Sequence, residues 1–109
     1  MDYKVKSLDI FEKQAKRLVK KYPSLKIELY ELVQELKKNP TCGTAIGKNS
    51  YKIRISIASK GKGKSGGARV ITNFVISDTT VYLLSIYDKS EQESLTNKEL
   101  NELLKYIPQ

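Results

Sequence analysis

The chain of 109 residues contains no histidine, no tryptophan and a single cysteine. Without histidine, Ser-His-Asp catalysis, histidine–metal coordination and imidazole acid–base chemistry are excluded. The lone Cys42 excludes an internal disulfide and a cysteine-based zinc site, and it fits a reducing compartment. No apolar run approaches the roughly 20 residues that span a membrane, and the N-terminus has no signal-peptide core. We therefore expect a cytoplasmic protein that contacts no membrane and uses no metal or other cofactor.

Acidic residues are also missing from one long stretch of the chain. No Asp or Glu occurs between Leu36 and Ser77, although the formal net charge of the whole chain is only +8. Within that stretch, residues 59–69 form a segment in which lysine and glycine alternate, here called the Lys/Gly connector. Glycine lets a ligand approach the backbone closely and lysine supplies positive charge, so this pattern favours a polyanion such as the phosphate backbone of a nucleic acid.

The Lys/Gly connector also matches two nucleotide-binding patterns by letter. Residues 61–66 spell G-x-G-x-x-G, and residues 63–65 resemble the end of a Walker A loop. Both motifs need a helix directly after the glycines, whereas a β-branched strand is predicted here, and the first Walker glycine is replaced by Ala58. We reject both, and interpret the connector as a loop between strands whose lysines contact RNA.

Hydrophobic periodicity predicts one α+β domain over residues 1–109, with a small antiparallel sheet of about four strands, two N-terminal helices and one C-terminal helix. Residues 41–50 are interpreted as a loop. The predicted strands cover residues 3–8, 51–57, 69–76 and 81–87, and the predicted helices cover residues 9–22, 24–38 and 96–107.

Four cations stand at related places in these strands. Lys52 and Arg54 share the polar face of one strand, about 7 Å apart. Arg69 begins the next strand and Lys89 follows the last one, so pairing of the strands would bring all four together. Solvated lysines on an exposed sheet face explain each cation singly, but the lack of carboxylates nearby favours a functional group. We call Lys52, Arg54, Arg69 and Lys89 the cation cluster.

Several segments resemble the RelE/HigB branch of toxins from bacterial type II toxin–antitoxin systems. They are residues 51–54, 58–64, 66–69 and 82–91, and the long Lys/Gly connector is most similar to the HigB-like subgroup. The resemblance extends over nearly the whole chain and includes the order of its elements. It implies a ribosome-dependent endoribonuclease that cuts mRNA and inhibits translation. It also implies a cognate antitoxin that neutralises the toxin, and contact with operator DNA only indirectly, through that antitoxin.

The resemblance also implies roles for individual residues. Lys52, Arg54, Arg69 and Lys89 occupy the catalytic positions of the family. The RelE branch often has a catalytic tyrosine at the position of Leu95, so Tyr87 is an alternative source of a phenol. Contacts with RNA are expected from Lys48, Lys60, Lys62, Lys64 and Tyr87.

Cleavage of RNA without a metal requires attack by a 2′-hydroxyl on the adjacent phosphorus and departure of the 5′-oxygen. Neighbouring cations favour the neutral form of Lys52, which makes it the candidate base. Arg69, assisted by Arg54, suits the phosphate oxygens as negative charge builds. Lys89 would stabilise or protonate the leaving oxygen, and Tyr87 would stack on a base.

Two alternatives stay open. A non-catalytic module that binds RNA or the ribosome would need the same positive charge, and the departure at Leu95 favours it. A ParE-like inhibitor of DNA gyrase would share the fold, but it would not need converging cations. The cation cluster therefore favours the nuclease.

Overall fold

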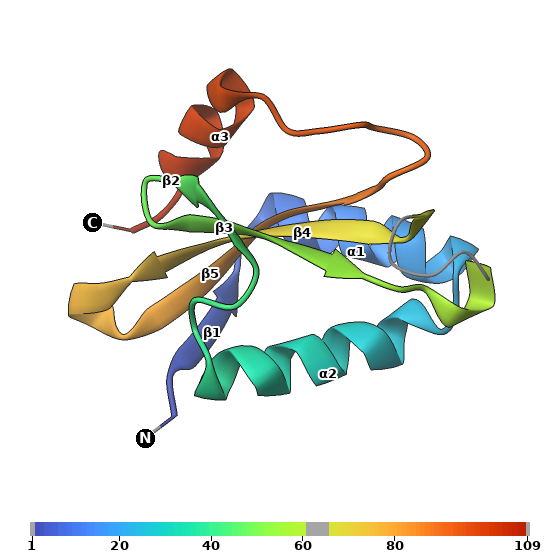
Figure 1. Ribbon diagram of the computed structural model, residues 1–109, viewed down its shortest axis with the longest axis horizontal. Helices are drawn as coiled ribbons and strands as arrows, with labels where there is room; N and C mark the ends of the chain where they lie inside the picture. The colour runs from blue at the N-terminus through green and yellow to red at the C-terminus, as the bar shows by residue number, and fades with distance from the viewer. Residues whose placement is uncertain (1, 61–65, 109) are drawn as a thin grey trace.

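A five-stranded mixed sheet forms the centre of the protein, in a computed structural model that describes residues 2–60 and 66–108. The strand order is β1-β5-β4-β3-β2, and the helices lie on both faces (Figure 1). In chain order the elements are β1 (Lys4–Ser7), α1 (Asp9–Lys21), α2 (Leu25–Lys38), β2 (Thr44–Gly47), β3 (Ser50–Ile55), β4 (Ala68–Val75), β5 (Thr80–Asp88) and α3 (Asn97–Leu104).

The α+β class and the three helices are confirmed, but the predicted sheet differs in two respects. First, it is not wholly antiparallel, because β1 pairs with β5 in parallel, with Lys4 opposite Thr80 and Ser7 opposite Leu83. A parallel pair needs a long crossover connection, and the segment holding α1 and α2 lies within it. Second, the sheet has a fifth strand, β2, in the segment predicted as a loop.

Strand β2 was missed because its signals are weak. It has four residues at the edge of the sheet, and two of them, Ala45 and Gly47, are of types that are depleted in strands. The tight turn to β3 is made by Lys48 and Asn49, both with positive φ (54° and 58°). Positive φ at both central residues is the geometry of a type I′ hairpin, usually signalled by Asn-Gly or Asp-Gly.

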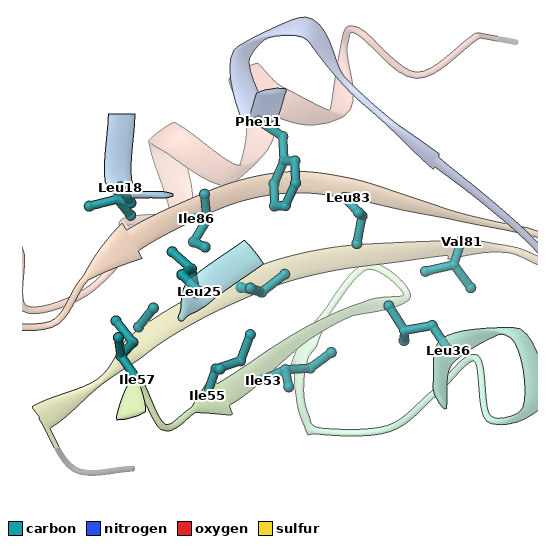
Figure 2. Close-up of a cluster of buried hydrophobic side chains, with 12 residues drawn as sticks. Phe11, Leu18, Leu25, Leu36, Ile53, Ile55, Ile57, Val81, Leu83 and Ile86 are labelled. Carbon is teal, nitrogen blue, oxygen red and sulfur yellow. The ribbon is translucent and has the colours of Figure 1, made fainter. Parts of the chain in front are cut away.

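Two hydrophobic clusters cover the two faces of the sheet. On one face, α1 and α2 pack Phe11, Leu18, Leu25 and Leu36 against inward-facing residues of β3, β4 and β5 (Figure 2). We call this the two-helix face. The opposite face is covered by α3 and is called the α3 face; Figure 1 shows α2 and α3 on opposite sides of the sheet. No described helix has the length and apolarity needed to cross a membrane.

A β-bulge between β4 and β5 changes which face the end of β5 presents. Ile71 pairs with Ser85, but the next residue, Thr72, pairs with Leu83, so Leu84 is extra. Before the bulge Leu83 points to the two-helix face, and after it Ile86 does. The bulge therefore turns Tyr87 towards the α3 face, as bulges beside functional sites often do.

The side chain of Gln14 satisfies the backbone at this bulge. Its Oε1 accepts hydrogen bonds from Ser85 Oγ at 3.1 Å and from the Ile86 N–H at 3.0 Å. A bulge leaves backbone groups outside the regular ladder, and a buried N–H without a partner costs about 1–3 kcal/mol. Helix α1 thus helps to fix the register of β5.

Candidate active site

Three side chains form a row on the α3 face, where β3, β4 and β5 run side by side. The strand registers place Arg54 opposite Arg69, and Arg69 opposite Tyr87. Residues on either side of each are buried on the two-helix face, so strand alternation directs these three to the α3 face. Directly opposed residues have Cβ atoms about 4.5–5.5 Å apart, which makes each member of the row a neighbour of the next.

Two lysines extend the row along the strands. Lys52 lies two residues before Arg54 on the same face of β3. Lys89 follows the end of β5; its N–H donates to the Gly67 carbonyl at 3.0 Å and its Nζ donates to the Glu93 carbonyl at 2.8 Å. Lys52, Arg54 and Arg69 thus lie on the α3 face, and Lys89 begins the segment that leads from β5 to α3.

The members of the cation cluster differ in exposure. Arg54 is exposed, Lys52 and Lys89 are half-buried, and Arg69 is buried with 5% of its surface exposed. Among the described residues, no carboxylate forms an ion pair with Lys52, Arg54 or Lys89. Nη1 of Arg69 donates to the Ala68 carbonyl at 3.3 Å. Close like charges without carboxylate partners create a positive potential that attracts phosphate.

Gly43 packs closely against the backbone of Lys52. Gly43 precedes β2 with φ +101°, and a Cβ atom added to it would lie 2.7 Å from the Lys52 carbonyl oxygen. Both the positive φ and this close approach require glycine. The chain before β2 therefore packs directly against the strand that carries Lys52.

Tyr87 occupies a different environment from the one predicted. Its ring is 4% exposed and packs with Leu100 in the hydrophobic cluster beneath α3, so it does not present a face for stacking on a base. Its hydroxyl is buried near the Leu95 backbone and makes no hydrogen bond of normal geometry within the described part of the chain. Burial raises the pKa of Tyr87 although Arg69 lies nearby, so the phenol stays protonated at neutral pH.

A small pocket opens beside Lys52. Its volume is about 190 Å³, and it lies between the sheet and the segment that begins α3. Ile46, Ile71, Leu95 and Leu100 supply apolar walls, and Lys52, Ser94, Thr96 and Asn97 supply polar groups. Sequence reasoning did not find the polar rim at residues 94–97, because Ser, Thr and Asn before a helix are equally typical of capping. Thr96 does cap α3, in a reciprocal pair with Glu99.

Lys60 is predicted to bind RNA, but its side chain points away from the cation cluster. Its ammonium group pairs with Asp88 on the two-helix side of the sheet, and the two side chains are 8% and 0% exposed. Nζ also donates to Ser90 Oγ at 3.1 Å and lies 5.4 Å from the centre of the Tyr22 ring. A buried, paired ammonium cannot reach a phosphate, so Lys60 is a structural residue in this conformation.

Asp88 is the partner that sequence reasoning missed. Burial alone would raise the pKa of its carboxyl group, but hydrogen bonds from Lys60, Ser90 and Tyr22 outweigh burial and hold the pKa well below its usual range. The carboxylate is therefore ionised at neutral pH. An acid after the apolar run of β5 resembles an ordinary end of a strand, and only the fold shows that Lys60 reaches it.

Among the remaining predicted RNA-binding lysines, Lys48 is the one that the structure describes. Lys48 lies in the β2–β3 turn, four residues before Lys52, and its Nζ donates to the Asn101 side chain of α3. Lys62 and Lys64 fall outside the described residues. Strand β4 follows the connector, in agreement with the rejection of both nucleotide-binding motifs.

Two larger hollows lie elsewhere on the protein. One of about 610 Å³ lies between β1, the start of α1 and Tyr106, and another of about 420 Å³ lies beside the C-terminal end of α3. Neither is lined by a residue of the cation cluster. The described residues include no group of three or more His, Cys, Asp or Glu side chains that could hold a metal ion.

Comparison with protein families identifies the relatives of this chain. The family described as "RelE toxin of RelE / RelB toxin-antitoxin system" matches residues 8–108, almost the whole chain. The chain belongs to the RelE family of toxins. The resemblance noted in residues 51–54, 58–64, 66–69 and 82–91 is thereby confirmed at the level of the family.

Solved structures show that this RelE-family toxin also shares the fold. A double arginine-to-alanine mutant of Escherichia coli toxin RelE in the free state is similar with a TM-score of 0.65 and 15% identity, covering 99% of this chain and 100% of that one. The Mycobacterium tuberculosis RelBE2 toxin–antitoxin complex gives 0.55 and 13%, covering 81% and 92%. A metal-bound toxin from Helicobacter pylori gives 0.52 and 18%, covering 82% and 97%.

Proposed function

We propose that this toxin is a metal-independent endoribonuclease that cuts mRNA on the ribosome in the cytoplasm and thereby inhibits translation. The observation that carries the proposal is the row on the α3 face, in which Arg54 opposes Arg69 and Lys52 and Lys89 stand beside it. Phosphoryl transfer from RNA needs positive charge around one phosphate more than it needs any other group. The cation cluster supplies this charge, and within the described part of the chain Lys52, Arg54 and Lys89 form no ion pair with a carboxylate.

The reaction would begin with attack of a ribose 2′-oxygen on the adjacent phosphorus. The 2′-hydroxyl loses its proton, the P–O5′ bond breaks, and the 5′-oxygen takes up a proton, which leaves a 2′,3′-cyclic phosphate. No water, metal or cofactor enters this step. The protein must therefore supply a base, an acid, charge stabilisation and in-line alignment.

The exposures in the cation cluster suggest a division of roles. Arg54, which is exposed, would make the first contact with the phosphate. Arg69 is almost fully covered in this conformation, so its guanidinium would meet the non-bridging oxygens after RNA binding uncovers it, and would stabilise the negative charge that builds on them. Lys52 on one side would act as the base, and Lys89 on the other side would assist departure of the 5′-oxygen.

The pocket beside Lys52 would hold one base of the RNA. Its volume of about 190 Å³ is below the roughly 300–1,000 Å³ of pockets for drug-sized ligands, so it suits a single ring system. Proteins commonly read single-stranded RNA by separating a base from its neighbours and bonding its edges. Ser94 and Asn97 offer side-chain donors and acceptors for this purpose.

An antitoxin protein is the other partner that we propose. The relative from Mycobacterium tuberculosis is described as a toxin–antitoxin complex, and the present chain shares its family and fold. The positive net charge of +8 suits an acidic antitoxin segment as well as ribosomal RNA.

Mapping the 5′ ends of cellular transcripts after brief induction tests the nuclease directly. Wild-type toxin should produce cuts within translated codons, and Arg69→Ala should reduce the cleavage rate by about 10²–10³-fold, as loss of a preorganised charge donor does elsewhere. Lys16→Ala is the control, because Lys16 is an exposed cation on α1, away from the cation cluster and from the turn that carries Lys89. Cleavage by Arg69→Ala at the wild-type rate would refute the role of Arg69.

The same experiment separates the alternatives. Arrested growth with intact mRNA and broken DNA would favour a gyrase inhibitor. Ribosome binding without any cut transcript would favour a non-catalytic module.

A further inference from the structure

Asp88 stands between two residues of the α3 face but points the other way. It is the last residue of β5, opposite Ala68, and Tyr87 and Lys89 flank it. Strand alternation sends its carboxylate to the two-helix side, where it is completely buried. The carboxylate therefore cannot touch RNA at the cation cluster, although the backbone of Asp88 leads directly into Lys89.

Three separate segments of the chain donate to this carboxylate. Tyr22, which ends α1, donates from its hydroxyl at 2.8 Å. Lys60 donates from Nζ, and Ser90 donates from its N–H at 2.9 Å and from Oγ at 2.7 Å. Asp88 thus ties the end of α1, the start of the Lys/Gly connector and the turn after β5 to one point.

The start of the connector is held at further points. The Ala58 N–H donates to Glu28 Oε2 at 2.8 Å, and the Ser59 N–H donates to Ser24 Oγ at 2.9 Å. Both acceptors belong to the first part of α2 or directly precede it. Together with Lys60, these contacts fix the last described residues before position 61.

The turn that carries Lys89 is held in the same way. The N–H groups of Glu91 and Gln92 donate to the Asp88 carbonyl at 2.9 and 3.0 Å. Glu91 pairs with Arg17 at 2.7 Å, which attaches the turn to α1 from the outside. Lys89 lies between the carboxylate bonds of Asp88 and these turn bonds, so its backbone has little freedom to move.

We propose that Asp88 is a positioning residue, which acts on cleavage by fixing the direction in which Lys89 leaves β5. This inference rests on the proposed nuclease function, but the geometry it describes can be measured without any cleavage. An ionised carboxylate that holds Ser90 on one side and Lys60 on the other sets the place of Lys89 relative to Arg69. Misplacement of a catalytic group by about 1 Å can cost roughly 100-fold in rate.

The first test is the kinetics of Asp88→Asn, which keeps the size of the side chain and removes its charge. At a temperature where the variant is folded, kcat for cleavage should fall by about 10–100-fold while RNA affinity stays within about twofold. Adding Lys89→Ala should cause little further loss, because both substitutions remove the same contribution. The proposal would be overturned if Asp88→Asn kept the wild-type kcat. It would also be overturned if the loss of kcat in the double variant equalled the product of the fold losses of the two single variants.

A charge-free pair separates positioning from stability. The double variant K60M/D88L replaces the ion pair by two apolar side chains, an exchange that often costs little for the pair itself, although the Tyr22 hydroxyl and the Ser90 N–H lose their acceptor. It should fold but keep a low kcat, because the introduced leucine cannot accept hydrogen bonds from Ser90. Recovery of wild-type kcat would show that the ion pair serves stability alone. Asp78→Asn is the control, since Asp78 is an exposed aspartate in the β4–β5 turn.

Hydrogen exchange tests the geometry independently of the nuclease. The Lys89 N–H is bonded to Gly67, and in Asp88→Asn it should exchange at least about tenfold faster while the amides of Val70 and Ile86 stay protected. Unchanged protection at Lys89 would overturn the positioning role whether or not the toxin cuts RNA. If wild-type toxin cuts no RNA but Lys89 exchange responds, the nuclease proposal fails and the positioning of Lys89 by Asp88 stands.

Discussion

Lys60 and Arg54 come from the same acid-free part of the sequence, yet the structure gives them opposite surroundings. Lys60 is buried beside Asp88, with Tyr22 and Ser90 completing its environment. Arg54 is exposed on the α3 face, without a carboxylate partner among the described residues. The difference arises from the fold, because Asp88 of β5 reaches Lys60, whereas Arg54 lies on the other face, opposite Arg69. A basic stretch of sequence is therefore not one functional unit.

The largest expected effect comes from breaking the buried pair. Lys60→Ala leaves the Asp88 carboxylate buried without its counter-ion, and loss of one partner of such a pair costs about 3–5 kcal/mol in the free energy of unfolding. Urea denaturation followed by circular dichroism measures this. Lys48→Ala is the control, since Lys48 is exposed, and its unfolding free energy should change by less than about 0.5 kcal/mol. Equal effects of the two substitutions would contradict the difference between buried and exposed lysines.

The opposite behaviour is expected for Arg54. Arg54→Ala should change the free energy of unfolding by less than about 0.5 kcal/mol, because the side chain is exposed. Its cleavage rate should nevertheless fall by about 10–100-fold, as loss of one phosphate contact in the transition state does. Arg54→Lys should recover only part of the rate, since lysine lacks the planar fork of arginine. An unfolding loss that matches the loss of cleavage would show that Arg54 acts through the fold.

Acid should weaken the region around Lys60 and Asp88. The pKa of Asp88 is lower in the folded protein than in the unfolded chain, where it is about 3.9. Its stabilising contribution is therefore complete above that value and is lost as the pH falls towards the folded pKa. Between about pH 5 and pH 2.5 the wild type should lose more unfolding free energy than K60M/D88L, which lacks the carboxylate. If the unfolding free energies of the two proteins changed equally with pH, the assigned role of Asp88 would be contradicted.

A smaller effect is expected from the cap of α3. Thr96 Oγ1 accepts from the Glu99 N–H at 3.1 Å, and Thr96→Ala should cost about 1 kcal/mol. Because Thr96 also lines the pocket beside Lys52, Thr96→Ser, which keeps the cap, is the comparison that isolates capping. The two variants should differ in thermal unfolding, and equal melting temperatures would show that the cap contributes nothing measurable.

Most of the fold could be predicted from the sequence because its periodicities are strong. Ile53 and Ile55 alternate with Lys52 and Arg54, and this pattern predicted β3 and the direction of its cations. Strand β5 has apolar residues on both faces, so its sequence shows no alternation from which the bulge at Leu84 could be predicted. In a regular strand, Tyr87 would lie on the same face as Leu83, which is the two-helix face. The bulge shifts this alternation by one residue and places Tyr87 beside Arg69.

The candidate site was predicted only in part, for a related reason. Sequence position indicated that Arg69 and Lys89 could meet Lys52 and Arg54; the strand registers place Arg54 opposite Arg69, and Lys89 directly follows β5. Burial is a property of the folded chain, so neither the covered ring of Tyr87 nor the pairing of Lys60 could be read from residue types. The roles of the cation cluster in cleavage stay predictions until the variants are measured.

The parallel pairing of β1 with β5 also has a consequence for the order in which the toxin is completed during synthesis. β1 begins at Lys4, and its neighbour in the described sheet begins at Thr80, so β1 stays unpaired until most of the chain has been made. Contacts between such distant segments form slowly, because a long loop must close first. Strand β5 also carries Tyr87 of the row and leads directly into Lys89. A nascent or truncated chain that ends before β5 thus lacks both a complete sheet and a complete cation cluster.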